Sequence, residues 1–213
     1  MAEEIFVSPK KTGRIAVFLS GRGSNFQAIH DAITAGKINA AIALVFSNVE
    51  TAPGLLTARE RGLETFYLNP KLFPNREDYD KEAVRQVRKR DVDLVCLAGY
   101  MRILSSYFCR EFKGRCINIH PALLPAFPGL HVQQKAIDWG VKFSGATVHF
   151  VAEDVDMGPI IIQAVVPVLQ DDTEDSLAAR ILVEEHKIYP EAVRLFFEGR
   201  LEVRGRRVFI REA

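Results

Sequence analysis

The sequence lacks the features of a membrane or secreted protein. No hydrophobic run approaches the roughly 20 residues that a membrane-spanning helix needs. The N-terminus is mixed in charge and has no hydrophobic block followed by a small-residue cleavage site, so we expect neither a secretory signal nor a membrane partner. The three cysteines, Cys96, Cys109 and Cys116, lack the spacing of a metal site. They are odd in number and predict buried free thiols in a reducing, cytoplasmic compartment.

The chain also lacks an excess of charge of either sign. Lys and Arg number 28 and Asp and Glu number 27, which gives a formal net charge of +1. A protein without a polybasic surface is not expected to bind nucleic acid. Of the 213 residues, 48% are hydrophobic and 26% charged, as in ordinary globular proteins. We therefore predict one domain over residues 1–213, with residues 1–12 as a flexible leader.

Short hydrophobic runs alternate with helical patterns along the chain. The runs at 14–20, 40–47, 65–68, 94–98 and 116–120 predict strands, and helical spacing predicts helices at 26–35, 53–61, 76–89 and 132–139. Two further strands are expected at 144–151 and 159–168, then a long helix from 171 or 172 to about 197 and a hairpin over 201–210. This alternation predicts an α/β protein with an open, mostly parallel, twisted sheet and helices on both of its faces.

A glycine-rich loop follows the first predicted strand. Gly21 and Gly23 would let the backbone approach a phosphate, and Ser24 and Asn25 add donors at a helix N-terminus. A dinucleotide fingerprint would need a third glycine where Phe26 stands, and the Gly-Lys-Ser/Thr of a P-loop is absent. The loop therefore favours a single phosphate. The alternative is a glycine-rich turn capped by Ser24 or Asn25.

Asn118 and His120 lie two residues apart on a predicted strand, so their side chains point to one face. An amide can donate to a developing oxyanion, and an imidazole can move protons near neutral pH. Asp156, in an acidic loop, could orient the imidazole. The alternatives are core hydrogen bonding for the first pair and a surface turn for Asp156. Packing or surface roles, and no zinc site, are expected for the other histidines: His30, His131, His149 and His186.

Five segments, taken together, resemble the phosphoribosylglycinamide formyltransferase family. They are IAVFLSGRGSNFQAI, LAGYMRIL, INIHPALLPAFPGLH, GATVHFVAEDVDMGPII and EEHKIYPEAV, in the family's order from residue 15 to 197. The resemblance implies a Rossmann-like formyltransferase fold. It also implies a cytoplasmic enzyme of purine biosynthesis that carries a formyl group from 10-formyltetrahydrofolate to the amine of glycinamide ribonucleotide. These small molecules would be its partners, no metal would be needed, and the enzyme would be a monomer or homodimer.

The resemblance also implies roles for particular residues. Asn118, His120 and Asp156 match the catalytic trio. The ribonucleotide would contact Gly23, Ser24, Asn25 and Glu185. The folate would contact Arg76, Met101, Arg102, Ile103, Leu104, Asn118, Ala152, Glu153, Asp154, Val155 and Asp156. The N-terminal half would thus bind the phosphate and the C-terminal half the folate. Ala122 and Ala126 depart from the family's common residues, and we expect them to alter the packing of the proline-rich loop and not the activity.

In the reaction that the resemblance implies, the substrate amine attacks the formyl carbon directly. Asn118 and protonated His120 would stabilise the oxyanion, and Asp156 would position a water for proton transfer. Three alternative functions are less favoured. A formyltetrahydrofolate deformylase shares the trio but is expected to carry a further N-terminal domain. A methionyl-tRNA formyltransferase is expected to carry a C-terminal RNA-binding domain. The third is a phosphate- or nucleotide-binding module without catalysis.

Overall fold

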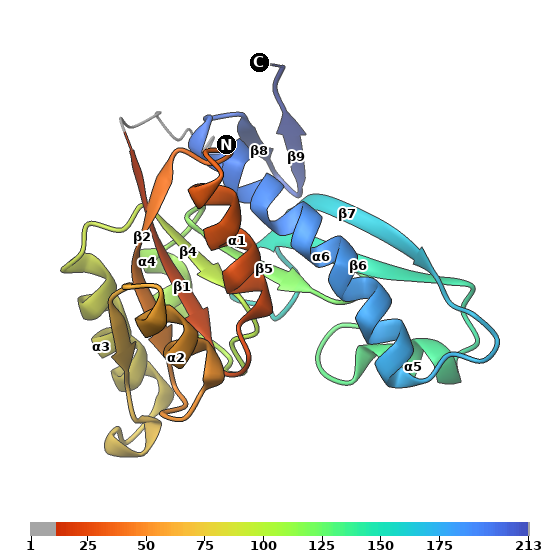
Figure 1. The fold of residues 1–213 in the computed structure, drawn as a ribbon, viewed down its shortest axis with the longest axis horizontal. Helices are drawn as coiled ribbons and strands as arrows, with labels where there is room; N and C mark the ends of the chain where they lie inside the picture. Colours follow the sequence, from red (N-terminus) through yellow and green to blue (C-terminus); the bar gives the residue numbers. More distant parts are fainter. Residues whose placement is uncertain (1–11, 213) are drawn as a thin grey trace.

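The computed structural model describes residues 12–212, so all of the predicted leader except Thr12 lies outside the described residues. The described residues form one nine-stranded sheet in the order β3-β2-β1-β4-β5-β6-β7-β9-β8 (Figure 1). The strands are β1 (Gly13–Leu19), β2 (Ala40–Ser47), β3 (Thr65–Tyr67), β4 (Leu94–Leu97), β5 (Cys116–His120), β6 (Phe143–Phe150), β7 (Ile160–Pro167), β8 (Leu201–Arg204) and β9 (Arg207–Ile210).

The sheet is mostly parallel, and this confirms the predicted α/β class. Strands β1 to β5 pair in parallel, whereas β6 is antiparallel to both β5 and β7. The predicted C-terminal hairpin is present as β8 and β9. It is also part of the sheet, because β9 pairs in parallel with β7 through Arg207 and Ile160.

Six α-helices and one short 3-10 helix connect these strands in the described part of the chain. They are α1 (Ser24–Thr34), α2 (Pro53–Glu60), η1 (Pro70–Leu72), α3 (Arg76–Arg88), α4 (Ser106–Glu111), α5 (Val132–Asp138) and α6 (Glu174–Phe197). Sequence analysis missed α4 and η1, which have six and three residues and are too short to show a helical period. The long helix begins at Glu174, after the expected 171 or 172, because the side chain of Thr173 caps it.

The central strands are buried on both faces, which explains their continuous hydrophobic runs. In β1, Ile15, Val17 and Leu19 pack into one core with α1, α2, α5 and α6. Ala16 and Phe18 face the opposite way, into a second core with α3 and α4. This confirms the prediction of helices on both faces.

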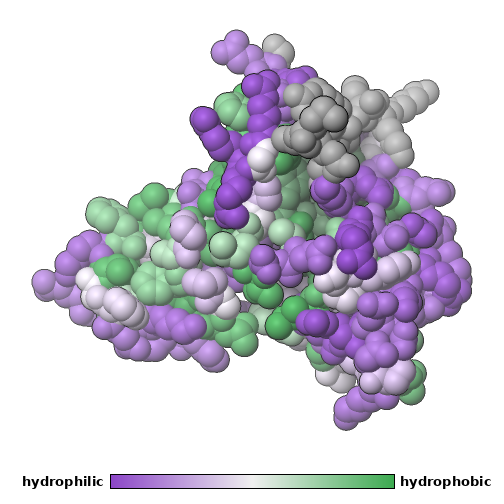
Figure 2. All heavy atoms as spheres, turned by 180° about the vertical axis from the view of Figure 1, so that it is seen from behind, coloured by the Kyte–Doolittle hydropathy of each residue, from purple (hydrophilic) through white to green (hydrophobic). Residues whose placement is uncertain are grey.

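The antiparallel part of the sheet is less completely covered. Phe143 on β6 and Val165 on β7 are 62% and 60% exposed. Figure 2, which shows the molecule from behind, has hydrophobic side chains gathered on the side where α5, β6 and β7 lie. The helical cover on this rear face is therefore concentrated over the parallel strands.

Helix α6 crosses the sheet diagonally and is fixed to two strands by Tyr189 (Figure 1). The hydroxyl of this fully buried residue lies 3.0 Å from the carbonyl oxygen of Leu97 on β4 and 3.2 Å from that of Ile117 on β5. Burial raises the pKa of this phenol well above its ordinary value, so it is a hydrogen-bond donor at any physiological pH. The bond holds α6 over the junction of β4 and β5.

Tyr189→Phe removes this donor while keeping the ring, and we expect it to destabilise the protein by about 1–2 kcal/mol. Chemical denaturation measures the loss. The control is Tyr107→Phe on α4, where the ring keeps its contact with Lys81 and the hydroxyl is not among the hydrogen-bonded groups of residues 12–212, so we expect almost no change. Equal effects of the two substitutions would show that the Tyr189 hydroxyl does not fix α6.

Candidate active site

The loops that follow β1 and β4 meet at the carboxyl edge of the parallel strands (Figure 1). The backbone N–H of Ser20 donates to the carbonyl of Gly99 at 3.0 Å, and the hydroxyl of Ser20 accepts from the N–H of Met101 at 2.8 Å. The helices after these two strands pack on opposite faces, which makes this point a topological switch. Open α/β sheets bind their ligands at such a point.

The glycine-rich loop turns sharply into α1. Gly23 has a φ of 73°, a left-handed conformation that favours glycine, and a Cβ there would lie 3.1 Å from the Cα of Gly54. No side chain caps the N-terminus of α1, so the alternative of a turn capped by Ser24 or Asn25 is wrong. An uncapped helix N-terminus behind a close glycine turn suits an anion.

Asn25, in the first turn of α1, contacts α6. Its Nδ2 donates to Oε2 of Glu185 at 2.6 Å, and both residues are buried. Burial raises the pKa of the Glu185 carboxyl, and the hydrogen bond from Asn25 opposes that shift. The Oδ1 of Asn25 is buried without a partner among the described residues. Two of the four residues predicted to contact the ribonucleotide therefore contact each other, although 160 residues separate them.

The side chains of Asn118 and His149 face each other across the antiparallel pair β5–β6. Nδ1 of His149 lies 2.9 Å from the carbonyl oxygen of Phe150, so this nitrogen carries the hydrogen. Nε2 then accepts from Nδ2 of Asn118 at 3.2 Å. Burial lowers the pKa of His149 in spite of the Phe150 carbonyl and the nearby Asp156, which both favour the charged ring. A neutral His149 thus orients the Asn118 amide and leaves its second hydrogen available.

His120 lies between the proline-rich loop and the acidic loop. Its Nε2 is 2.9 Å from the carbonyl oxygen of Phe127, and its Nδ1 is 3.5 Å from Oδ2 of Asp156. Oδ2 of Asp156 also accepts from the N–H of Gly129 at 2.9 Å, and its Oδ1 is 3.7 Å from Nε2 of His149. Both ring nitrogens of His120 therefore face acceptors. Asp156 contacts the two histidines and the proline-rich loop at once.

The structure thus brings Asn118, His120 and Asp156 into one cluster, together with a residue that sequence analysis missed. His149 was expected to pack in the core or lie at the surface, and it is indeed buried, but it also lies between Asn118 and Asp156. The signal that could have found it is the antiparallel register of the predicted strands at 116–120 and 144–151. That register pairs Asn118 with His149 and His120 with Thr147.

The predicted folate-side residues lie on three separate segments. Arg76 is the first residue of α3 and is exposed. In the segment after β4, Met101 and Ile103 are 68% and 57% exposed, whereas Leu104 is buried. The guanidinium of Arg102 stacks on the ring of Tyr79, 4.4 Å from its centroid. Arg76 and this segment belong to the N-terminal half, so the predicted folate residues are not confined to the C-terminal half.

The third segment is the acidic loop between β6 and β7. Glu153, Asp154 and Val155 are exposed, while the side chain of Asp156 turns inward and is 9% exposed. The carbonyl of Ala152 accepts from the thiol of Cys109, and burial raises the pKa of that thiol to about 11. The surface turn expected from spacing alone therefore holds for the tip of the loop but not for Asp156.

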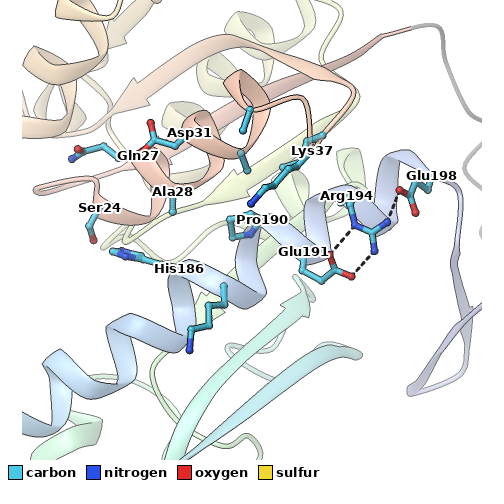
Figure 3. A pocket seen from close by; sticks show the side chains of 14 residues that line it. Ser24, Gln27, Ala28, Asp31, Lys37, His186, Pro190, Glu191, Arg194 and Glu198 are labelled. Carbon is cyan, nitrogen blue, oxygen red and sulfur yellow. Dashed lines mark hydrogen bonds and ion pairs between the residues drawn. The ribbon is translucent and has the colours of Figure 1, made fainter.

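A separate cavity of about 1190 Å³ lies between α1 and α6 (Figure 3). Ser24 and His186 lie close together at one end of it, while Asn118, His120 and Asp156 do not line it. No group of three or more His, Cys, Asp or Glu side chains in residues 12–212 is placed to hold a metal ion. The same part of the chain contains no helix long and hydrophobic enough to cross a membrane.

Comparison with known proteins identifies the formyl transferase family. A model of the formyl transferase family matches residues 13–193. Phosphoribosylglycinamide formyltransferase of Escherichia coli is 46% identical over 189 residues, which cover 89% of this chain and 89% of that protein. The crystal structure of glycinamide ribonucleotide transformylase 1 from Symbiobacterium toebii superposes with a TM-score of 0.93 at 50% identity and covers 95% of each chain.

The chain also matches part of a much longer protein. The trifunctional purine biosynthetic protein adenosine-3 of Drosophila melanogaster is 50% identical over 188 residues, 87% of this chain but only 14% of that protein. The similarity is thus to one segment of a multifunctional chain and to nearly the full length of the bacterial proteins.

The lowered pKa of His149 predicts a pH dependence of stability. The unfolded chain takes up a proton near pH 6.5 and the folded chain only at a lower pH, so stability falls as pH drops through this window. Between pH 7 and pH 5, we expect the melting temperature of His149→Gln to fall less than that of the wild type. The control is His131→Gln, because the side chain of His131 is 80% exposed. Parallel pH profiles for wild type and His149→Gln would contradict the prediction.

Proposed function

The chain belongs to the phosphoribosylglycinamide formyltransferase family, and on that premise we propose that it transfers a formyl group from 10-formyltetrahydrofolate to the amine of glycinamide ribonucleotide in purine biosynthesis. One observation carries the proposal beyond the family. Asn118 and His120 on β5 and Asp156 in the acidic loop converge on one site, beside the loops that follow β1 and β4.

The transfer needs no covalent enzyme intermediate. The amine nitrogen attacks the formyl carbon, the carbonyl becomes an oxyanion, and the bond from the formyl carbon to N10 of the folate then breaks. Asn118 stabilises the oxyanion with the amide hydrogen that His149 does not accept. When protonated, His120 donates to the same oxygen from Nε2, in place of the Phe127 carbonyl that this nitrogen faces in the structure. The proton lost by the amine reaches N10 through His120 or through a water oriented by Asp156.

The two substrates approach this cluster from different segments. The ribonucleotide phosphate binds at the turn of Gly23 and Ser24, and Asn25 and Glu185 contact the rest of that substrate. The folate lies between the segment Met101–Leu104 and the acidic loop, and Arg76 pairs with one of its carboxylates. The two positions at which this chain departs from the family's common residues lie outside these contacts. Ala122 is fully buried with its carbonyl bonded to Thr147, and Ala126 is exposed.

A formyl-transfer assay tests the proposal directly. The purified protein is incubated with 10-formyltetrahydrofolate, with and without glycinamide ribonucleotide, and both tetrahydrofolate and formylated ribonucleotide are quantified. We expect the two products in equal amounts and only in the presence of the ribonucleotide. Tetrahydrofolate with free formate would indicate a deformylase. If the protein binds one of the substrates but forms no product, it is a binding module without catalysis.

Asn118→Ala removes the proposed oxyanion donor, and we expect kcat to fall by ~10²–10³ because one lost donor of this kind typically costs that much. Affinity for a folate analogue should change little, since the contact forms mainly in the transition state. The matched control is Asn69→Ala, which removes an amide that caps η1 and should leave kcat unchanged. Retention of most of the turnover by Asn118→Ala would exclude the oxyanion role.

A further inference from the structure

Asp80 on α3 is a buried carboxylate that the reaction does not use. It is 1% exposed, and its Oδ2 accepts from the backbone N–H of Ser105 at 2.6 Å. Ser105 is itself 4% exposed and caps the N-terminus of α4, where its hydroxyl accepts from the N–H of Phe108. A buried carboxylate is costly to desolvate, so its position against one backbone N–H points to a specific constraint on that backbone.

The constrained backbone is the segment predicted to line the folate pocket. Met101–Leu104 has neither helical nor strand structure, so no ladder of backbone hydrogen bonds fixes it. At the start of the segment, the N–H of Met101 donates to the hydroxyl of Ser20. Just after its end, the N–H of Ser105 donates to Asp80. The segment is therefore held at both ends by side chains from other parts of the chain.

The neighbouring residue on α3 holds a side chain of the same segment. The ring of Tyr79 lies under the guanidinium of Arg102, and its hydroxyl is 3.1 Å from that of Tyr100. Burial raises the pKa of Asp80, while the hydrogen bonds from Ser105 and then the charges of Arg102 and Arg76 oppose that shift. Tyr79 thus contacts a side chain of the segment Met101–Leu104, and Asp80 holds the backbone at its end.

We propose that Asp80 is a positioning residue for the folate: its hydrogen bond to the Ser105 N–H keeps the segment Met101–Leu104 in the conformation that binds the co-substrate. The inference rests on the proposed function, which places the folate against this segment. Without the bond the segment occupies several conformations. The apparent affinity for folate is then the intrinsic affinity multiplied by the fraction of molecules whose segment is in the binding conformation. The ribonucleotide loop is not attached to Asp80 and should keep its affinity.

Two substitutions of Asp80 separate positioning from general stability. Asp80→Ala removes the acceptor, and we expect the KM for 10-formyltetrahydrofolate to rise roughly tenfold while kcat and the KM for the ribonucleotide change little. Asp80→Asn keeps an oxygen that can accept from Ser105, so its folate KM should stay near the wild-type value. If the cavity left by alanine prevents folding, Asp80→Leu fills the space without accepting a hydrogen bond. It should show the same selective rise.

The matched control is Gln86→Ala on the same helix. Gln86 is 5% exposed and hydrogen-bonded to Glu82 and Arg90, away from the folate segment. We expect this variant to lower the melting temperature without changing the folate KM. The proposal is overturned if Asp80→Asn raises the folate KM as much as Asp80→Ala, if Asp80→Ala lowers only the melting temperature, or if Gln86→Ala raises the folate KM equally.

Calorimetric binding of 5-formyltetrahydrofolate to the same variants separates this proposal from the proposed function. The probe is a stable folate that does not require turnover. A wild-type protein that binds it but transfers no formyl group contradicts the proposed function, while weaker binding by Asp80→Ala alone still supports the role of Asp80. A wild-type protein that binds no folate overturns both.

Discussion

The antiparallel pairing of β6 with β5 is the constraint on which the candidate site depends. Its register places His149 opposite Asn118 and Thr147 opposite His120, and these side chains all point to one face of the sheet. The chain then turns back into β7 so closely that a Cβ at Gly158 would lie 1.7 Å from the carbonyl oxygen of Phe150. This close return brings the acidic loop back over the strands, and Asp156 reaches both histidines.

Buried polar contacts fix the segments that surround this cluster. Asn25 and Glu185 join α1 to α6, and Asp80 joins α3 to the start of α4. Each contact links elements that are distant in the chain. A buried donor or acceptor that loses its partner costs about 1–3 kcal/mol, so these contacts disfavour other arrangements of the same helices. The hydrophobic cores place the helices against the sheet, and the polar contacts select their positions along it.

Most strands and helices were predicted within one to three residues because hydrophobic period and turn residues are local signals. The convergence of Asn118 and His120 was also predicted, since it follows from the period of a single strand. The position of Asp156 came only from the family resemblance, because spacing alone favoured a surface turn. His149 was missed, and so was the bond between Asn25 and Glu185. Each of these depends on how two distant segments align.

The sequence by itself determined the alternation of strands and helices, the glycine turn before α1, and the family to which the chain belongs. These features depend on residues close together in the chain or on motifs in a fixed order. The tertiary structure decided the neutral form and the position of His149, the inward turn of Asp156, and the burial of Asp80 against Ser105. Their physical cause is strand register and desolvation, which arise only when segments far apart in the chain are packed together.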